Sequence, residues 1–86
     1  MQIPPHPGRV KIFYKSYGEE KEHFMHEEIV NNPSDKTYMF FQGHMYIPIV
    51  KIVKTIRDGY SIKEEKYDIN GHLLDVEELP HSNCPK

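Results

Sequence analysis

The sequence predicts a small all-β protein, folded as an antiparallel barrel or rolled sheet of five to six short strands. Near the start, Val10, Ile12 and Tyr14 alternate with mainly charged neighbours, a period of two that is typical of a strand with one face in a core. Near the end, the pairs Asp58-Gly59 and Asn70-Gly71 separate segments with strand-like composition. These residue types tolerate the positive φ of tight turns, so they predict two successive hairpins.

The chain has room for one domain, because 86 residues lie in the lower part of the usual range of about 50 to 250. Three prolines between positions 4 and 7 fix φ and exclude a helix, so residues 1–8 are expected to form an extended arm. Residues 9–79 carry the strand patterns and are expected to form the single β domain. Pro80 ends the last strand, and residues 80–86 are expected to form a flexible tail.

Residues 19–31 permit two interpretations. In a helix, Phe24, Met25 and Ile29 would share one face, which would make the fold α+β. In a strand, this segment would return from the first strand through a turn at Gly18. The strand is favoured, and the helix is kept as the alternative.

The middle of the chain is rich in apolar side chains. Residues 37–41 are β-branched or aromatic with apolar groups on both faces, which predicts a central strand. Gln42-Gly43 predicts a turn into a long strand that starts at Met45 and continues to Ile56. Because Pro48 lacks an amide donor, it belongs at an edge or a bend of that strand.

The last hairpin has a register that the sequence predicts residue by residue. If Asn70-Gly71 is a two-residue loop, apolar contacts and one ion pair fall opposite each other, and each such pair stabilises a sheet by about 0.2–1 kcal/mol. The predicted pairs are Ile69 with His72, Tyr67 with Leu74, Lys66 with Asp75, and Ile62 with Leu79.

Two short patterns resemble known families. The run from Pro33 to Ile69, with its succession of turns and short strands, is similar to the rhythm of small SH3-like barrels and covers under half of the chain. The segment Tyr67-Asp68-Ile69-Asn70-Gly71-His72-Leu73 resembles the Tyr-Asp-x-x-Gly-Arg-Leu unit of YD-repeat shells. This unit occurs once and has His72 where Arg is usual, so we interpret it as hairpin chemistry and assign the chain to no family.

The charge balance gives no general attraction to nucleic acid or to an anionic membrane. There are 11 Lys or Arg residues and 13 Asp or Glu residues, a formal net charge of −2. The single cysteine, Cys84, has no partner for an internal disulfide, and the first residues contain no apolar leader, so a cytoplasmic location is expected. No stretch approaches the roughly 20 apolar residues of a transmembrane helix.

No residue pattern indicates catalysis. Glutamate doublets recur, but adjacent residues on a strand point to opposite faces, and one of them is normally solvated. The serines lie in no nucleophile elbow, and the five glycines are dispersed rather than gathered in a phosphate-binding loop. We therefore expect neither enzyme activity nor a cofactor.

Four residues have the spacing of zinc ligands. His23 and His26 form one pair and His81 and Cys84 the other, and two such pairs can hold tetrahedral Zn²⁺. On a strand, however, residues 23 and 26 are expected to point to opposite faces, which prevents chelation. No metal site is therefore expected.

The predicted partner-binding surface is an uncharged segment in the middle of the chain. It consists of Met45, Tyr46, Ile47, Pro48, Ile49 and Val50. Alternate residues of an extended strand point to opposite faces, and here both sets are apolar, whereas a domain of this size covers only one. We expect a non-enzymatic protein-interaction or regulatory module, suited to a bacterial or phage accessory protein, that binds a protein partner or forms a homodimer.

The alternative function is binding of single-stranded nucleic acid. Small barrels bind single strands with basic groups that follow the phosphates beside aromatic stacking platforms. Acidic residues within the same stretch leave an excess of only two positive charges. The candidate residues are Lys51, Lys54, Arg57, Tyr60, Lys63, Lys66 and Tyr67.

Overall fold

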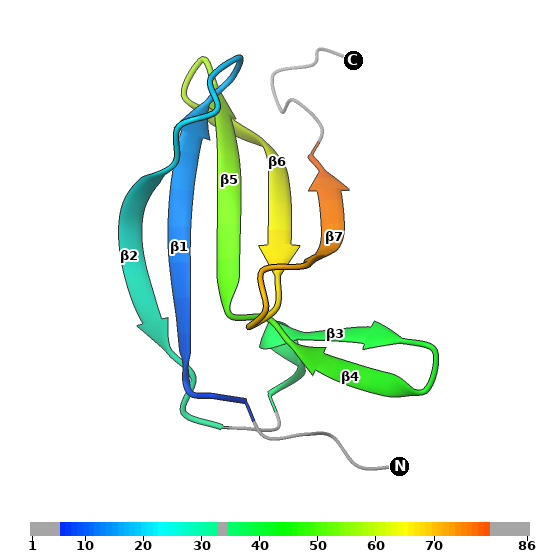
Figure 1. Ribbon diagram of the computed structural model, residues 1–86. Coiled ribbons are helices and arrows are strands. Elements are labelled where there is room, and N and C mark those ends of the chain that lie inside the picture. Colours follow the sequence, from blue (N-terminus) through cyan, green and yellow to red (C-terminus); the bar gives the residue numbers. More distant parts are fainter. Residues whose placement is uncertain (1–5, 33–34, 80–86) are drawn as a thin grey trace, which may run out of the picture.

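The computed structural model describes residues 6–32 and 35–79, and within them the chain is all-β, as the sequence predicts. Seven strands form two sheets. The larger sheet has the strand order β2-β1-β5-β6-β7, and the smaller one is the β3-β4 hairpin, which projects from one end of the larger sheet (Figure 1). The strands are β1 (Arg9–Ser16), β2 (His23–Ile29), β3 (Met39–Gln42), β4 (Met45–Pro48), β5 (Lys51–Arg57), β6 (Tyr60–Tyr67) and β7 (Leu73–Glu78).

The structure decides two questions about this architecture. The segment 19–31 contains the strand β2, so the alternative of a helix there is wrong. The described residues form seven strands rather than five to six, and the larger sheet is mixed rather than antiparallel, because β1 and β5 pair in parallel. β2 and β7 lie at the two edges of the larger sheet, and no strand pairing among the described residues closes it into a barrel. In that part of the chain there is also no helix with the length and apolar content needed to cross a membrane.

β1 forms because its residues alternate, which buries Val10 and Ile12 on one face of the sheet. The chain turns back at Gly18, which takes a φ of 88°, so the predicted return hairpin is confirmed. β2 runs antiparallel to β1 with one extra residue, Met25, opposite the step from Ile12 to Phe13. This bulge changes which residues of β2 share a face.

The main core lies on one face of the larger sheet, which we call the core face. It is completed by the end of β2 and by the segments that enter and leave the hairpin. The buried cluster consists of Val10, Ile12, Val30, Ile49 and Ile52, with Tyr38, Phe40 and Leu74 packed against it. The opposite face, which we call the second face, carries Phe13, Val53 and Thr55, and the last two are buried.

The segment predicted as one long strand from Met45 to Ile56 is divided, so that prediction is wrong. The Ile49 amide still donates to the Tyr38 carbonyl beside the hairpin, at 2.9 Å, but the next amide, of Val50, donates to Tyr67 of β6, at 3.0 Å. The chain therefore passes from the small sheet to the large one between these two residues. Pro48 lies directly before this bend, at the kind of position that its missing amide predicts.

The segment predicted as a central strand, residues 37–41, begins instead as the 3-10 turn η1 (Lys36–Tyr38). The Asp35 carboxylate accepts a hydrogen bond from the Thr37 amide, at 2.9 Å, and this cap favours the turn over an extended chain. β3 follows and pairs with β4 alone among the described strands. The prediction of a central strand is therefore wrong.

The hairpin between β5 and β6 has the predicted turn. Arg57 pairs with Tyr60, and the two residues between them, Asp58 and Gly59, take φ values of 55° and 83°. Positive φ at both central positions matches the right-handed twist of the flanking strands.

The loop between β6 and β7 is longer than predicted, so the two-residue turn is wrong. The Asp68 carboxylate accepts hydrogen bonds from the amides of Asn70 and His72, at 2.9 and 2.8 Å. Of the two residues in the expected turn, only Gly71 takes a positive φ, of 82°. The aspartate thus holds the backbone in a wider loop.

A bulge restores most of the predicted register in β7. Leu74 is the extra residue, and beyond it Lys66 lies opposite Asp75 in the predicted register. The Lys66 ammonium, however, forms its ion pair with Glu77, at 3.2 Å. The Leu79 amide donates to the Ile62 carbonyl, at 2.9 Å, so this predicted contact is also present. The two pairs nearest the loop are wrong: Tyr67 pairs with Leu73, and the His72 carbonyl accepts from the Asp68 amide.

The end of the predicted arm belongs to the domain, because His6 is only 6% exposed. Residues 1–5, and the predicted tail at residues 80–86, lie outside the described residues.

Candidate functional site

The candidate site is the β3-β4 hairpin (Figure 1). Its turn is formed by Gly43 and His44, and Gly43 takes a φ of 64°. Pairing is regular from Gln42 and Met45 at the turn to Met39 and Pro48 at the base. The hairpin is therefore an undistorted two-stranded ladder that stands away from the larger sheet.

Two aromatic rings face each other across the hairpin near its tip. Phe41 and Tyr46 are paired in the ladder, and their ring centroids are 4.8 Å apart with a 50° angle between the planes. The Lys36 ammonium lies 5.4 Å from the centroid of the Tyr46 ring, which adds a cation–π contact. These contacts hold the Tyr46 ring in place without a partner protein.

Exposure rises steeply from the base of the hairpin to its tip. At the base, Met39 is 8% exposed and Ile49, which follows β4, is 3% exposed. Near the tip, Phe41 is 52% exposed and Met45 is 58% exposed. The hairpin is thus anchored in the domain at one end and presents large apolar side chains to solvent at the other.

The structure brings the predicted partner-binding residues together only in part. Met45, Tyr46, Ile47 and Pro48 form β4 and lie on the hairpin. Ile49 is a member of the buried cluster, so its side chain serves the core, and Val50 is half-buried at the entry to β5.

The backbone of β4 has one free edge. The Ile49 amide donates to Tyr38, and hydrogen-bonded pairs alternate along an antiparallel ladder, so the Ile47 amide also faces β3. The amide and carbonyl of Tyr46 therefore face outward. Pro48 also occupies an outward-facing position. Its missing amide therefore removes a donor from the free edge and leaves the ladder with β3 intact.

The hairpin carries no Asp, Glu, Lys or Arg between Met39 and Pro48. Native proteins usually protect a free strand edge with charged side chains, prolines or bulges, because an unprotected edge pairs with other chains. Here Pro48 protects one end of β4, and the middle of the strand has no charged residue, proline or bulge of its own, although the Lys36 ammonium lies over the Tyr46 ring.

The alternative nucleic-acid residues are divided between the two faces of the larger sheet, so they do not form one surface. Alternation along β5 and β6 causes the division. The second face carries Lys51, Arg57, Lys63 and Tyr67, and the core face carries Lys54 and Lys66. Tyr60 lies opposite Arg57 beside the turn.

Lys51 is the best-placed cation of this set. Its ammonium lies 5.1 Å from the centroid of the Phe13 ring and 5.2 Å from that of Tyr67, but it also forms an ion pair with Glu22, at 2.8 Å. Burial raises the pKa of Tyr67, and the nearby carboxylates of Glu65 and Glu22 raise it further. The Lys51 ammonium thus lies beside two aromatic rings, but nearby carboxylates compensate its positive charge.

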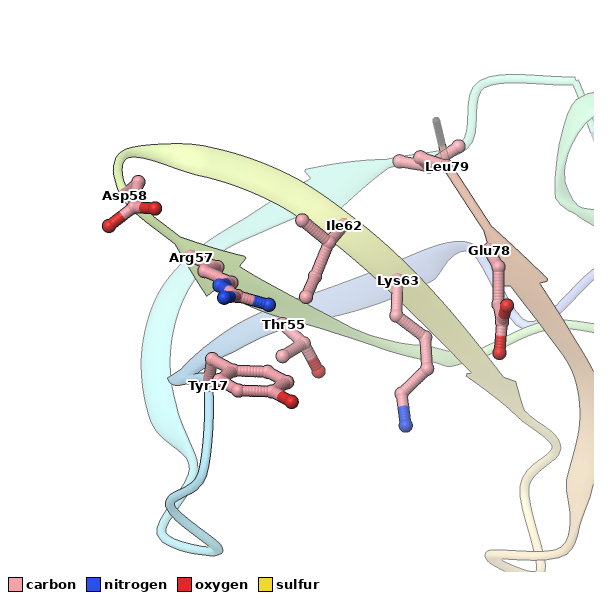
Figure 2. A pocket seen from close by; sticks show the side chains of 8 residues that line it. All are labelled: Tyr17, Thr55, Arg57, Asp58, Ile62, Lys63, Glu78 and Leu79. Carbon is pink, nitrogen blue, oxygen red and sulfur yellow. The ribbon is translucent and has the colours of Figure 1, made fainter. Parts of the chain in front are cut away.

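A hollow of about 600 Å³ lies beside these residues on the second face (Figure 2). It is lined by Tyr17, Thr55, Arg57, Asp58, Ile62, Lys63, Glu78 and Leu79. The buried Thr55 hydroxyl has no hydrogen-bond partner in the described part of the chain, and Figure 2 shows Thr55, Lys63 and Glu78 extending to the same side. Two cations and two carboxylates line the hollow, so its charge selects neither an anion nor a cation.

The bulge at Met25 overturns the expectation that His23 and His26 point to opposite faces. They pair with Tyr14 and Ile12, which are two residues apart on β1 and therefore share a face. The extra residue in β2 causes the difference.

The two imidazoles nevertheless have separate partners. The His23 ring stacks on Tyr14, with centroids 5.1 Å apart, and His26 Nε2 is 3.1 Å from Glu28 Oε2. Within residues 6–32 and 35–79, no three His, Cys, Asp or Glu side chains are grouped closely enough to hold a metal ion. The other pair predicted for zinc, His81 and Cys84, lies outside the described residues.

Tyr38 links the base of the hairpin to β2. Its hydroxyl donates a hydrogen bond to Glu28 Oε1. This bond, followed by the one with His26, lowers the pKa of Glu28, and the bond to Glu28 raises the pKa of Tyr38. The hairpin is therefore held by a polar contact as well as by apolar packing.

Phe41 is not among the predicted site residues, because the composition of residues 37–41 predicts a central strand. The missed signal is the turn: a two-residue loop at Gly43 and His44 puts Phe41 opposite Tyr46. Comparison of this chain with protein-family models, curated proteins and solved structures gives no match.

Proposed function

We propose that the protein is a non-enzymatic protein-interaction module and that the β3-β4 hairpin is its binding element. One observation carries the proposal: an uncharged hairpin projects from the domain with Phe41 and Met45 more than half exposed. Large apolar side chains gathered on a projecting element are typical of protein–protein contact surfaces. A partner would cover the tip and the free edge of β4.

In the described part of the chain, the hairpin has no third strand beside it. Two strands alone are marginally stable, and they gain stability when a third strand or another surface packs on them. Full burial of a Phe or Met side chain is worth roughly 1.5–3 kcal/mol, and about half of the surface of each residue remains exposed here. An added strand would also satisfy the outward backbone groups of Tyr46.

The anchored base supports the same function. Met39 and Ile49 are buried, and Tyr38 is bonded to Glu28, so the hairpin is positioned before any partner arrives. A binding element held in one conformation loses less conformational entropy when it binds.

Binding of single-stranded nucleic acid is less well supported. Its residues lie on two faces, and three cations of the second face form ion pairs with carboxylates. The pairs are Lys51 with Glu22 at 2.8 Å, Arg9 with Glu27 at 3.5 Å, and Lys15 with Glu65 at 3.8 Å. Compensated cations release fewer counterions from a phosphate backbone, which weakens the main driving force for such binding.

The test is affinity capture from an extract of the native host with three tagged baits: wild type, Tyr46→Lys and Tyr60→Lys. Tyr60 is the matched control, because it is also a tyrosine on a strand, is 46% exposed and lies in β6, outside the β3-β4 hairpin. Each captured protein is identified, purified separately and titrated against all three baits. If the tagged bait captures the host's own untagged copy of this protein, that copy counts as a partner.

The proposal expects an identified protein whose dissociation constant rises at least about tenfold for Tyr46→Lys, or about 1.4 kcal/mol, and is unchanged for Tyr60→Lys. A charge placed beside Phe41 must be desolvated in the complex, which causes the loss. If every identified protein binds Tyr46→Lys as tightly as wild type, the hairpin is not the binding element.

A further inference from the structure

The described residues contain four strands with an edge that pairs with no other strand: β2 and β7 in the larger sheet, and β3 and β4 in the hairpin. Their charges differ sharply. β2 contains Glu27 and Glu28, and β7 contains Asp75, Glu77 and Glu78, so a copy of either strand would bring like charges together. β3 and β4 contain no charged residue.

The two hairpin edges are alike in their free hydrogen-bonding groups and differ in their side chains. On β3, the outward amide of Met39 already donates to the Lys36 carbonyl, so that edge has lost a donor to η1. On β4, Tyr46 lies in the middle of the strand, and alternation points its amide and its carbonyl away from β3. Pro48, the ladder partner of Met39, has no amide, so each hairpin edge lacks one outward donor near the base. β4 is nevertheless the better edge for an added strand, because all of its residues are apolar or aromatic, whereas β3 contains the polar Gln42.

We infer that the partner of this edge is a second copy of the chain, with β4 running antiparallel to the β4 of the other copy about a two-fold axis at Tyr46. The inference rests on the proposed function and names its partner. It would join two hairpins into one four-stranded sheet, in which each copy contributes the same surface to the other.

The pairing about Tyr46 is self-complementary. The two Tyr46 residues face each other and exchange amide-to-carbonyl hydrogen bonds, and their rings extend the aromatic pair with Phe41 into a row across the interface. On the opposite side of the new sheet, Met45 of each copy faces Ile47 of the other. Every side-chain pair within the strand is then apolar or aromatic.

Pro48 fits this arrangement and limits it. In the same register Pro48 of each copy falls opposite His44 of the other, at the turn, where the added ladder ends. Its missing amide therefore removes no hydrogen bond from the centre of the interface. Shifting the second copy so that Pro48 faces Tyr46 would remove donors from the centre, so the proline selects against that register.

The experiment combines light scattering with amide hydrogen exchange followed by NMR, on the full chain, from low micromolar to high micromolar concentration. The inference expects the mass to double over this range. It also expects exchange of the Tyr46 amide to slow at least about tenfold, because that amide becomes hydrogen-bonded only in the pair. The Ile47 amide, which faces β3, is expected to exchange slowly at every concentration.

Two variants make the test specific. Tyr46→Pro removes the outward donor and leaves the ladder with β3 intact, so it should stay monomeric with native strand signals. Tyr46→Phe keeps the amide and the ring and should associate like wild type. A wild-type chain that stays monomeric, or a dimer in which Tyr46 exchange does not depend on concentration, would overturn the inference.

These outcomes are separate from failure of the proposed function. If wild type stays monomeric but an identified host protein still loses affinity for Tyr46→Lys, only the second copy is rejected as the partner. If the dimer forms and Tyr46→Pro does not weaken it, the chain associates through another surface and the inference is wrong.

Discussion

His6 and Ile49, which are far apart in the sequence, are joined by a hydrogen bond of 2.7 Å between the imidazole Nε2 and the Ile49 carbonyl oxygen. The other ring nitrogen of His6 accepts a hydrogen bond from the Gly8 amide, at 3.0 Å. This pattern assigns the donor role to Nε2 and the acceptor role to Nδ1. It connects the segment before β1 to the bend between the hairpin and the larger sheet.

Replacing this ring should destabilise the protein. His6→Phe keeps a ring near Tyr38, 6.2 Å away, but leaves the Ile49 carbonyl and the Gly8 amide without their partner. We expect a loss of about 1–3 kcal/mol in the free energy of unfolding, measured by urea denaturation. His44→Phe, at the exposed turn of the hairpin, is the control and should change stability by less than about 0.5 kcal/mol. If His6→Phe and His44→Phe lowered the free energy of unfolding by the same amount, the hydrogen bonds of His6 would contribute no stability.

A second prediction concerns the loop between β6 and β7. Gly71 takes a φ of 82°, where a β-branched side chain is strained even though a Cβ would meet no atom within 4 Å. Gly71→Val should therefore lower the free energy of unfolding by at least about 1 kcal/mol, whereas Gly71→Asn should cost less, because Asn tolerates this conformation. Unchanged thermal midpoints for both variants would reject the left-handed backbone at this position.

The hydrogen bond between Tyr38 and Glu28 gives a prediction about pH. It lowers the pKa of Glu28 in the folded state, so the stability it contributes is present above the pKa of the unfolded chain and is lost as pH falls through the folded pKa. Tyr38→Phe should raise the Glu28 pKa and weaken this acid dependence, as measured by NMR titration of the carboxyl carbon. Tyr14→Phe removes a hydroxyl elsewhere on the core face and should leave the Glu28 pKa unchanged.

The nucleic-acid alternative can be tested with residues that the structure places on opposite faces. At physiological salt we expect no micromolar binding of a single-stranded oligonucleotide, measured by fluorescence anisotropy, because three cations of the second face, including Lys51, form ion pairs with carboxylates. If binding is observed and Lys51→Glu removes it while Lys54→Glu does not, the second face binds nucleic acid and our ranking of functions is wrong.

Local patterns predict the strands of this fold better than they predict how the strands assemble. The alternation in β1 and the Asp58-Gly59 turn depend on neighbouring residues, and both expectations are confirmed. The parallel pairing of β1 with β5, which places Ile12 beside Ile52, joins segments separated by β2 and the hairpin. No local pattern encodes such a contact, because its stability comes from packing across the whole core.

Two errors, one at the base of the hairpin and one in the loop between β6 and β7, arise from carboxylates that bind backbone amides. Asp35 caps a turn where the composition of residues 37–41 favours a strand, and Asp68 widens a loop that Asn70-Gly71 alone would make tight. The predicted site differs from the observed one because the chain bends between Ile49 and Val50. The apolar run from Met45 to Val50 is visible in the sequence, but the bend that sends Ile49 into the core is not.

The central claim, that the hairpin is the binding surface, can be tested by methionine oxidation, because three methionines report on three environments in one chain. Met45 on the hairpin is 58% exposed, Met25 on β2 is 41% exposed, and Met39 at the hairpin base is 8% exposed. Dilute protein treated with peroxide and analysed by mass spectrometry should oxidise at Met45 and Met25 and remain reduced at Met39. When the partner is bound, whether a second copy or another protein, the account predicts that oxidation of Met45 slows several-fold while Met25 is unaffected. Equal oxidation of Met45 in the free and the bound protein would contradict it.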